Sequence, residues 1–360
     1  MAAATIQAQA RDEPRSQGKP KDRDFVQTRE GMLFCVTGYL HPPDRYTAYL
    51  KYSPDPDGKW RNGQTAYRRE LAYYHVSTVA ETIRYLEAHY PHYVSYCPVR
   101  DIRFSMVPHN QVARYFRPVE RLGEILAAPG DSLEQEVCEL VAYFKSLTGL
   151  SAAQLGVTGS LLTKSHNPAF SDIDLLVFGQ ANAARLKERL GPEGTAEFRR
   201  PSPEQVRRWC ERISQHHSIS VEEAAYLARR RWNYGYFGQR YVSIHATRQD
   251  GEIREEYGDR IYRGQGVARI RATLSDASES LFLPAQYGVR DVQVLEGEPA
   301  ASGVRELVSY EGIYCNVAGA GTVVEAYGKL ETVNGLPSRL VVGATRPAHG
   351  FINPLARSGS

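Results

Sequence analysis

The segment GVTGSLLTKSHNPAFSDIDLLVFG, residues 156–179, constrains the fold and chemistry of this chain more than any other. A Gly-Ser pair ends one apolar run, eleven residues follow, and a second apolar run begins with Asp-Ile-Asp. Short apolar runs bounded by glycine and polar residues are typical of buried strands. Because side chains two residues apart in a strand point to the same face, we expect Asp172 and Asp174 to lie together while Ile173 faces the core.

The two carboxylates predict a cation site. Two carboxylates on one strand face repel each other unless they are hydrated at an edge or share a cation. Mg²⁺ prefers one or two carboxylates together with the phosphates of a substrate. We therefore expect Asp172 and Asp174 to bind Mg²⁺ or Mn²⁺, and a pair of such ions would activate an attacking oxygen and steady a triphosphate.

The Gly-Ser pair predicts a phosphate site beside the cation. Gly159 allows the backbone to approach a phosphate closely. The Ser160 hydroxyl and nearby backbone N–H groups can donate hydrogen bonds to it. Lys164 and His166, on the loop that follows, are further candidates for contact with a triphosphate, and the alternative for Lys164 is an ordinary solvated loop lysine.

TGSLLTKSHNPAFSDIDLLVFG resembles the signature of the polymerase-beta-like nucleotidyltransferase superfamily: a helix, Gly-Ser, about ten residues and Asp-x-Asp in a strand. The chain as a whole is similar to an uncharacterised, largely archaeal group of predicted nucleotidyltransferases. The resemblance implies transfer of a nucleoside monophosphate from an NTP to an acceptor hydroxyl, with release of pyrophosphate. It assigns metal binding and catalysis to Asp172 and Asp174, and the triphosphate to Gly159 and Ser160.

The superfamily usually supplies a third carboxylate from a later strand. The matching segment in this chain is RYVSIHATR, whose alternation places Tyr241, Ser243 and His245 on one face. We therefore expect His245 at the third position, where a neutral imidazole can bind a metal or act as a general base. The alternative is a strand histidine that is bonded to a neighbour.

A second segment, ARRRWNYGYFGQR, interleaves basic and aromatic residues, a pattern that can hold phosphates and stack bases. Between Arg199 and Arg240, nine arginines stand against four glutamates, which gives a local net charge of +5. This excess favours a polyanionic substrate, and an arginine-rich helix end is an equal alternative.

The remaining patterns predict an α+β protein in several parts. We expect a central polymerase-beta-type mixed sheet with helices, an N-terminal α+β module, and a small C-terminal β-barrel or sandwich with a hairpin at Asn334-Gly335. The segment GDSLEQEVCELVAYFKSLTGL predicts a helix that is capped at Asp131 or Ser132, has a capping box and ends at Gly149. The expected parts are a tail at 1–23, the module at 24–118, the nucleotidyltransferase domain at 130–257 and the barrel at 258–352.

Composition excludes several classes of protein. No apolar run approaches the roughly 18 residues that a membrane helix needs. The N-terminus lacks the apolar core of a signal peptide, so we expect a cytoplasmic protein with no membrane partner. The five cysteines are scattered and form no CxxC pair, which argues against a disulfide framework or a structural zinc site. A net charge of +3 neither demands nor excludes RNA or DNA as a partner.

Two other functions fit the same residues. Without a third carboxylate, the chain would be a non-catalytic nucleotide- or RNA-binding protein with a degenerate site. The acidic pair is incidental if the chain is a structural or assembly module. Metal-dependent consumption of NTP separates the enzyme from both, and an OB-like C-terminal barrel would favour an RNA or DNA end as acceptor.

Overall fold

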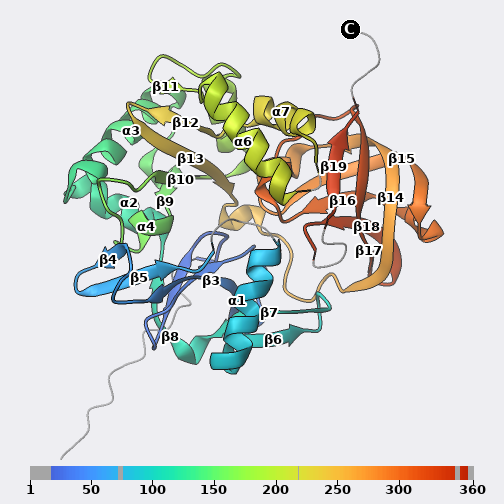
Figure 1. The fold of residues 1–360 in the computed structure, drawn as a ribbon, viewed down its shortest axis with the longest axis horizontal. Coiled ribbons are helices and arrows are strands. Elements are labelled where there is room, and N and C mark those ends of the chain that lie inside the picture. Colours follow the sequence, from blue (N-terminus) through green and yellow to red (C-terminus); the bar gives the residue numbers. More distant parts are fainter. Residues whose placement is uncertain (1–17, 72–75, 218, 345–348, 356–360) are drawn as a thin grey trace, which may run out of the picture.

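The computed structural model describes residues 18–71, 76–217, 219–344 and 349–355. Three parts follow one another along the chain: a sheet with one long helix, a smaller sheet covered by helices, and a β-barrel (Figure 1). The α+β class and the central mixed sheet that the sequence predicts are therefore confirmed.

The N-terminal part is an eight-stranded sheet. Six strands run in the order β4-β5-β3-β2-β1-β8, β7 pairs with β3, and β6 pairs with β7. Helix α1 packs on this sheet through Leu86, which belongs to one buried cluster with Val26, Phe34 and Leu50. The elements are β1 Phe25–Thr28, β2 Leu33–Val36, β3 Arg45–Pro54, β4 Trp60–Asn62, β5 Thr65–Arg69, α1 Val76–His89, β6 Val94–Cys97, β7 Ile102–Pro108 and β8 Val112–Phe116.

Residues just before this sheet tie it to the central part. Residues 1–17 of the predicted tail lie outside the described residues. In residues 18–23, the Asp22 carboxylate is buried and accepts the N–H of Gly38 at 2.9 Å. The carbonyl of Arg23 accepts a hydrogen bond from the Thr158 hydroxyl at 2.7 Å, directly beside the Gly-Ser pair.

The central part begins with helices α2 Pro118–Ala127 and α3 Ser132–Thr148. Asp131 caps α3, since its side chain accepts the N–H of Glu134 at 2.9 Å. The predicted capping box does not close onto Asp131. The Glu134 carboxylate instead accepts the N–H of Gly130 at 2.8 Å and pairs with the buried guanidinium of Arg121. The helix ends at Gly149, whose φ of 73° is left-handed.

The central sheet is mixed, in the order β11-β12-β13-β10-β9, and only β10 and β13 run parallel. Helices α3 and α5 cover one face, where Val141 and Leu186 pack against Ile173, Leu175 and Ile244. The other face carries polar side chains, among them Asp174 and Ser243, beside the buried Leu176. The remaining elements of this part are β9 Leu155–Val157, α4 Gly159–Leu162, β10 Ile173–Phe178, α5 Gln180–Leu190, β11 Phe198–Arg199, α6 Pro203–His216, α7 Val221–Arg230, β12 Tyr234–Phe237 and β13 Arg240–Thr247.

The C-terminal part is a closed ring of strands. The order is β14-β15-β16-β18-β17-β19, and an additional pairing of β14 with β17 closes the ring. The predicted hairpin forms at Asn334-Gly335, where Val333 pairs with Leu336. Helices α6 and α7 pack on the barrel core through Cys210 and Leu227. The strands are β14 Tyr262–Asp276, β15 Ala285–Gly297, β16 Glu306–Ser309, β17 Val323–Val333, β18 Leu336–Val342 and β19 Phe351–Pro354.

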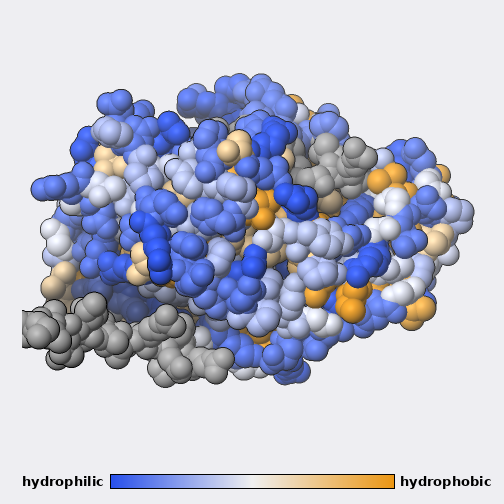
Figure 2. Space-filling model, turned by 90° about the horizontal axis from the view of Figure 1, so that it is seen from below, coloured by the Kyte–Doolittle hydropathy of each residue, from blue (hydrophilic) through white to orange (hydrophobic). Residues whose placement is uncertain are grey.

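The face of the molecule that Figure 2 shows is mainly hydrophilic. Figure 2 shows one face of the molecule, on which hydrophobic residues form only small groups, most of them toward the barrel. Among the described residues, no helix combines the length and the apolar character that crossing a membrane requires.

Candidate active site

The acidic pair lies on the face of the central sheet opposite to α3 and α5. Parallel pairing sets Asp174 of β10 opposite Ser243 of β13, and Leu176 opposite His245. The Ser243 hydroxyl donates a hydrogen bond to Asp174 Oδ1, so both side chains lie on the same face. The strand alternation predicted for β13 is therefore the alternation that the structure has.

The two carboxylates repel each other in the folded chain. Asp172 is exposed, one residue before β10, and Asp174 is partly buried within the strand. The pKa of Asp172 is raised to about 6, first by the neighbouring charge of Asp174 and second by the protein around it, which displaces water. The positive charges of Lys51 and Arg69, from the N-terminal sheet, oppose this rise. The pair thus lies where additional positive charge is stabilising.

Gly159 brings the Gly-Ser turn against Asp174. It begins the short helix α4 directly after β9, with a left-handed φ of +64°. A Cβ at this position would lie 2.5 Å from Asp174 Oδ2, so any larger residue would displace the carboxylate. Ser160 is buried, and its carbonyl accepts the N–H of Ser165 at 2.9 Å. The strand, turn and acidic pair that the sequence places together are therefore adjacent in space.

The chemistry of these residues fits a hard divalent cation. Asp172 and Asp174 offer carboxylate oxygens, the ligands that Mg²⁺ and Mn²⁺ prefer. The absence of a Cβ at Gly159 leaves backbone next to Asp174 Oδ2, as a site for a small ion and a phosphate requires. Asp172 and Asp174 would hold the ion, with Gly159 on the phosphate side.

His245 lies behind Ser243 and does not take the position opposite Asp174. Its Nε2 is 2.9 Å from Ser243 Oγ and 3.9 Å from Asp174 Oδ1. Burial, together with the positive charges of Arg23 and Lys51, lowers the pKa of His245 well below its ordinary value. The imidazole is therefore neutral at pH 7. Since the Ser243 proton goes to Asp174, the proton between His245 and Ser243 belongs to Nε2.

The loop between the Gly-Ser pair and the aspartates is held by side-chain contacts with α2, with the cap of α3 and with β13. Lys164 forms an ion pair of 2.9 Å with Glu124 on α2, and His166 Nε2 lies 2.8 Å from Asp131 Oδ2. Arg240, at the start of β13, donates to the carbonyls of Ser171 at 2.8 Å and Pro168 at 3.0 Å. These contacts fix the approach to Asp172.

Asp131, Glu134 and His166 also lie within 4.8 Å of one another, as groups that hold a metal ion do. Arg121, however, already pairs with the Glu134 carboxylate, and Asp131 caps α3. Both carboxylates therefore have partners without a cation. We interpret this cluster as the anchor of the loop.

The N-terminal sheet forms a second wall of the site, a contribution that the sequence did not reveal. Asn62 donates to the carbonyl of Thr163 at 2.9 Å, and the N–H of Arg61 donates to the carbonyl of Ser165 at 3.1 Å. Leu162 of α4 packs in a buried cluster of the N-terminal sheet. The one available signal was Lys51, a charged residue in the apolar run RYTAYLKYS. Lys51 is only 5% exposed, and its ammonium group lies 5.3 Å from the centroid of the Phe25 ring.

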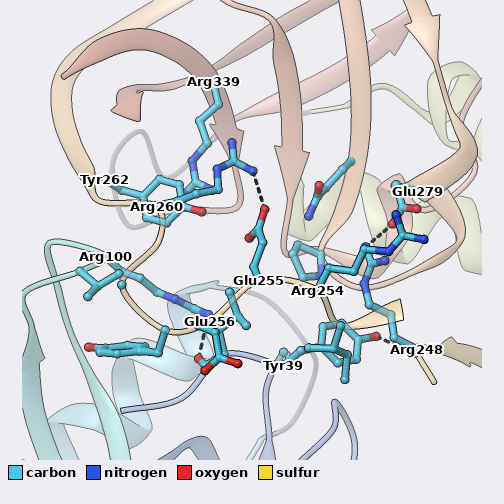
Figure 3. Close-up of a pocket in the computed structure, with 18 of the residues that line it drawn as sticks. Tyr39, Arg100, Arg248, Arg254, Glu255, Glu256, Arg260, Tyr262, Glu279 and Arg339 are labelled. Atoms are coloured by element: carbon cyan, nitrogen blue, oxygen red, sulfur yellow. Dashed lines mark hydrogen bonds and ion pairs between the residues drawn. The ribbon is translucent and has the colours of Figure 1, made fainter. Parts of the chain in front are cut away.

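A polar cavity of about 290 Å³ lies elsewhere, where the three parts meet (Figure 3). Arginines and glutamates line it as ion pairs, among them Arg248 with Glu279 and Arg260 with Glu306. Arg248, which lines the cavity, comes directly after the last residue of β13. The aspartates lie at the start of β10, which runs parallel to β13. The cavity is therefore at the opposite end of the sheet from the acidic pair.

Comparison with known proteins agrees with this geometry. Residues 137–245 match the family described as "Nucleotidyltransferase domain". This part of the chain is a polymerase-beta-like nucleotidyltransferase domain. The match contains the Gly-Ser turn and both aspartates, and it ends at His245.

The similarity extends beyond this domain in one archaeal relative. The chain is 28% identical over 339 residues to the uncharacterized protein MJ1086 of Methanocaldococcus jannaschii, a similarity that covers 92% of this chain and 97% of the relative. The similarity therefore includes sequence from all three parts of this chain. No solved structure matches the chain significantly.

Proposed function

We propose that the protein transfers a nucleoside monophosphate from an NTP to an acceptor hydroxyl. The acceptor oxygen forms a bond to the α-phosphorus, the bond from that phosphorus to the β-phosphate oxygen breaks, and pyrophosphate leaves. The acceptor proton passes to a base or to solvent. The observation that carries the proposal is the packing of Gly159 against Asp174 in the part of the chain that matches a nucleotidyltransferase domain.

Each proposed role follows from the position of the residue. Asp172 and Asp174 hold Mg²⁺ or Mn²⁺, which when bound neutralises triphosphate charge and activates the attacking oxygen. Gly159 and Ser160 cradle the triphosphate. Lys164 is a further triphosphate contact only if it leaves Glu124, from which it is now 2.9 Å. Catalysis would rest mainly on positioning and charge stabilisation, as in other phosphoryl transfers.

His245 acts through Ser243 in this proposal. Its neutral imidazole donates from Nε2 to the Ser243 hydroxyl, which in turn donates to Asp174. These two hydrogen bonds orient the Asp174 carboxylate without adding a third negative charge. Use of an NTP also fits the cytoplasmic location that we expect from the sequence.

A second function has its own supporting observation. Ser243 stands opposite Asp174, where a third carboxylate would face the pair, so the site has one negative charge fewer than its family usually supplies. A protein that binds nucleotide without turnover would fit such a site. Metal-dependent release of pyrophosphate distinguishes the two functions.

The first test is thermal stability of the wild type and of the Asp172→Asn/Asp174→Asn double variant with each NTP, with and without Mg²⁺ or Mn²⁺. A ligand that binds the native state raises the melting temperature by mass action. We expect a metal-dependent rise for the wild type and none for the variant. No rise with any NTP would contradict the proposed function, and pyrophosphate release in the presence of candidate acceptors is the next measurement.

A further inference from the structure

Three tyrosines lie on the same face of the sheet as the acidic pair, on the side away from the Gly-Ser turn. Strand β12 pairs with β13 so that Tyr234 stands opposite Ser243, and Tyr236 stands opposite Tyr241. Ser243 in turn stands opposite Asp174. Residues paired in register share a face, so these tyrosines lie on the face of the acidic pair. We call Tyr234, Tyr236 and Tyr241 the tyrosine platform.

The rings of the platform contact one another and lie near the carboxylates. The Tyr234 and Tyr241 rings are stacked with centroids 6.2 Å apart, and the Tyr236 and Tyr241 rings meet edge to face at 5.4 Å. Burial raises the pKa of Tyr241, and the charge of Asp172 adds to the rise, so Tyr241 is within electrostatic reach of the acidic pair. All three tyrosines are partly exposed.

Arg231 completes the platform with a positive charge. Its guanidinium lies 3.6 Å from the centroid of the Tyr234 ring and 4.3 Å from that of Trp209, on α6. Stacking uses the faces of the guanidinium and leaves its N–H edge for an anion. The Gln205 amide donates to the Tyr236 hydroxyl at 2.9 Å, which fixes the outer ring as well.

The strand order separates two sides of the acidic pair. It runs β9-β10-β13-β12, so the Gly-Ser turn follows the strand on one side of Asp174, and the platform lies on the other side. Under the proposed function the triphosphate occupies the Gly-Ser side. The acceptor hydroxyl must then approach from the platform.

We propose that the acceptor is the end of a single-stranded nucleic acid, with its terminal bases stacked on the tyrosine platform and a phosphate bound by Arg231. Base stacking on aromatic rings combined with a basic group is how proteins hold single strands. The surrounding segment carries nine arginines and four glutamates between Arg199 and Arg240, a charge that repels a cationic small molecule. This inference rests on the proposed function and names its acceptor class.

The test measures binding of fluorescently labelled single-stranded RNA and DNA by anisotropy at fixed ionic strength, in the full-length protein. We expect Tyr241→Leu and Arg231→Gln each to weaken binding about tenfold. The metal-dependent rise in melting temperature with NTP should be unchanged in both variants. Tighter binding of RNA or of DNA by the wild type identifies the acceptor strand.

Matched controls separate this site from general basic charge. Arg229→Gln removes an exposed arginine two residues from Arg231, and Tyr96→Leu removes a tyrosine that is 52% exposed on the N-terminal sheet. Both should bind oligonucleotide within twofold of the wild type. If Tyr241→Leu does not fold, Tyr236→Leu and Arg231→Gln carry the same test.

Two results would overturn the inference while the proposed function stands. In the first, the wild type responds to NTP and metal but binds neither oligonucleotide. In the second, it binds an oligonucleotide that the platform variants bind equally well. Failure of the wild type to respond to any NTP overturns the proposed function instead, and with it the assignment of this site to an acceptor.

Discussion

At the scale of single residues, the strand register decides which charged side chains face one another in the site. Asp172 and Asp174 are held together on one face, Lys51 and Arg69 partly offset them, and no third carboxylate faces Asp174 across β13. The aspartates could be predicted because strand alternation is local. Lys51 could not be assigned to the site, because it arrives from another sheet and only tertiary packing brings it there.

The raised pKa of Asp172 predicts how metal binding depends on pH. A carboxylate must lose its proton to bind a metal, and the pKa of Asp172 is about 6 without one. The apparent dissociation constant for Mn²⁺ should therefore be about tenfold larger at pH 5 than at pH 7. Titration calorimetry at the two pH values measures this ratio. Equal affinities would contradict the proposed ligand set.

The raised pKa of Asp172 also predicts how the free energy of unfolding depends on pH when no metal is bound. The folded state binds the Asp172 proton more tightly than the unfolded chain does. The stability that this proton binding adds is therefore full below pH 4 and is lost as the pH rises through 6. Asp174→Asn removes the repulsion and should raise the free energy of unfolding at pH 7 by about 1 kcal/mol, after allowance for solvent screening. Urea unfolding of both proteins without metal checks this, and a clear loss of stability would oppose the metal-site interpretation.

At the scale of elements, local signals predicted local structure and long-range pairing set the rest. The Asp131 cap, the Gly149 end and the Asn334-Gly335 turn all depend on neighbours in the sequence, and each forms as expected. The pairing of β3 with β7 and the docking of the N-terminal sheet on α4 join residues far apart in the chain. No periodicity reports such contacts, which is why the second wall of the site was not predicted.

Arg240 shows how one strand end positions the loop of another. It donates to the carbonyls of Ser171 and Pro168 and pairs with Glu136 on α3. Arg240→Gln should lower the free energy of unfolding by about 2 kcal/mol and abolish the rise in melting temperature with NTP and metal. Glu136→Gln is the matched control, since it removes the ion pair and keeps both carbonyl bonds. Equal losses of NTP response in the two variants would show that the loop bonds do not position Asp172.

At the scale of the whole molecule, the three parts share surfaces rather than standing apart. Helices α6 and α7, which belong to the central part, pack on the core of the barrel. Residues 18–23 join the N-terminal sheet to Thr158, the residue after β9. The polar cavity lies where all three meet, and Figure 3 shows Arg248 of the central part beside Glu279 of the barrel. The sequence gives no sign of this junction, because its charged residues run from Arg100 to Arg339, over some 240 positions.

Arg248 is the residue through which the junction can be tested. It pairs with Glu279 of the barrel, and its guanidinium lies 4.5 Å from the Phe282 ring centroid and 5.5 Å from that of Tyr39. Because these contacts are mostly shielded from solvent, Arg248→Gln leaves Glu279 without its partner and should lower the free energy of unfolding by about 2 kcal/mol. Arg290→Gln, which breaks the exposed pair with Asp291, should change it by less than about 0.5 kcal/mol. Urea unfolding midpoints measure both, and equal shifts would mean that the junction adds no more than a surface ion pair to the coupling between barrel and active-site sheet.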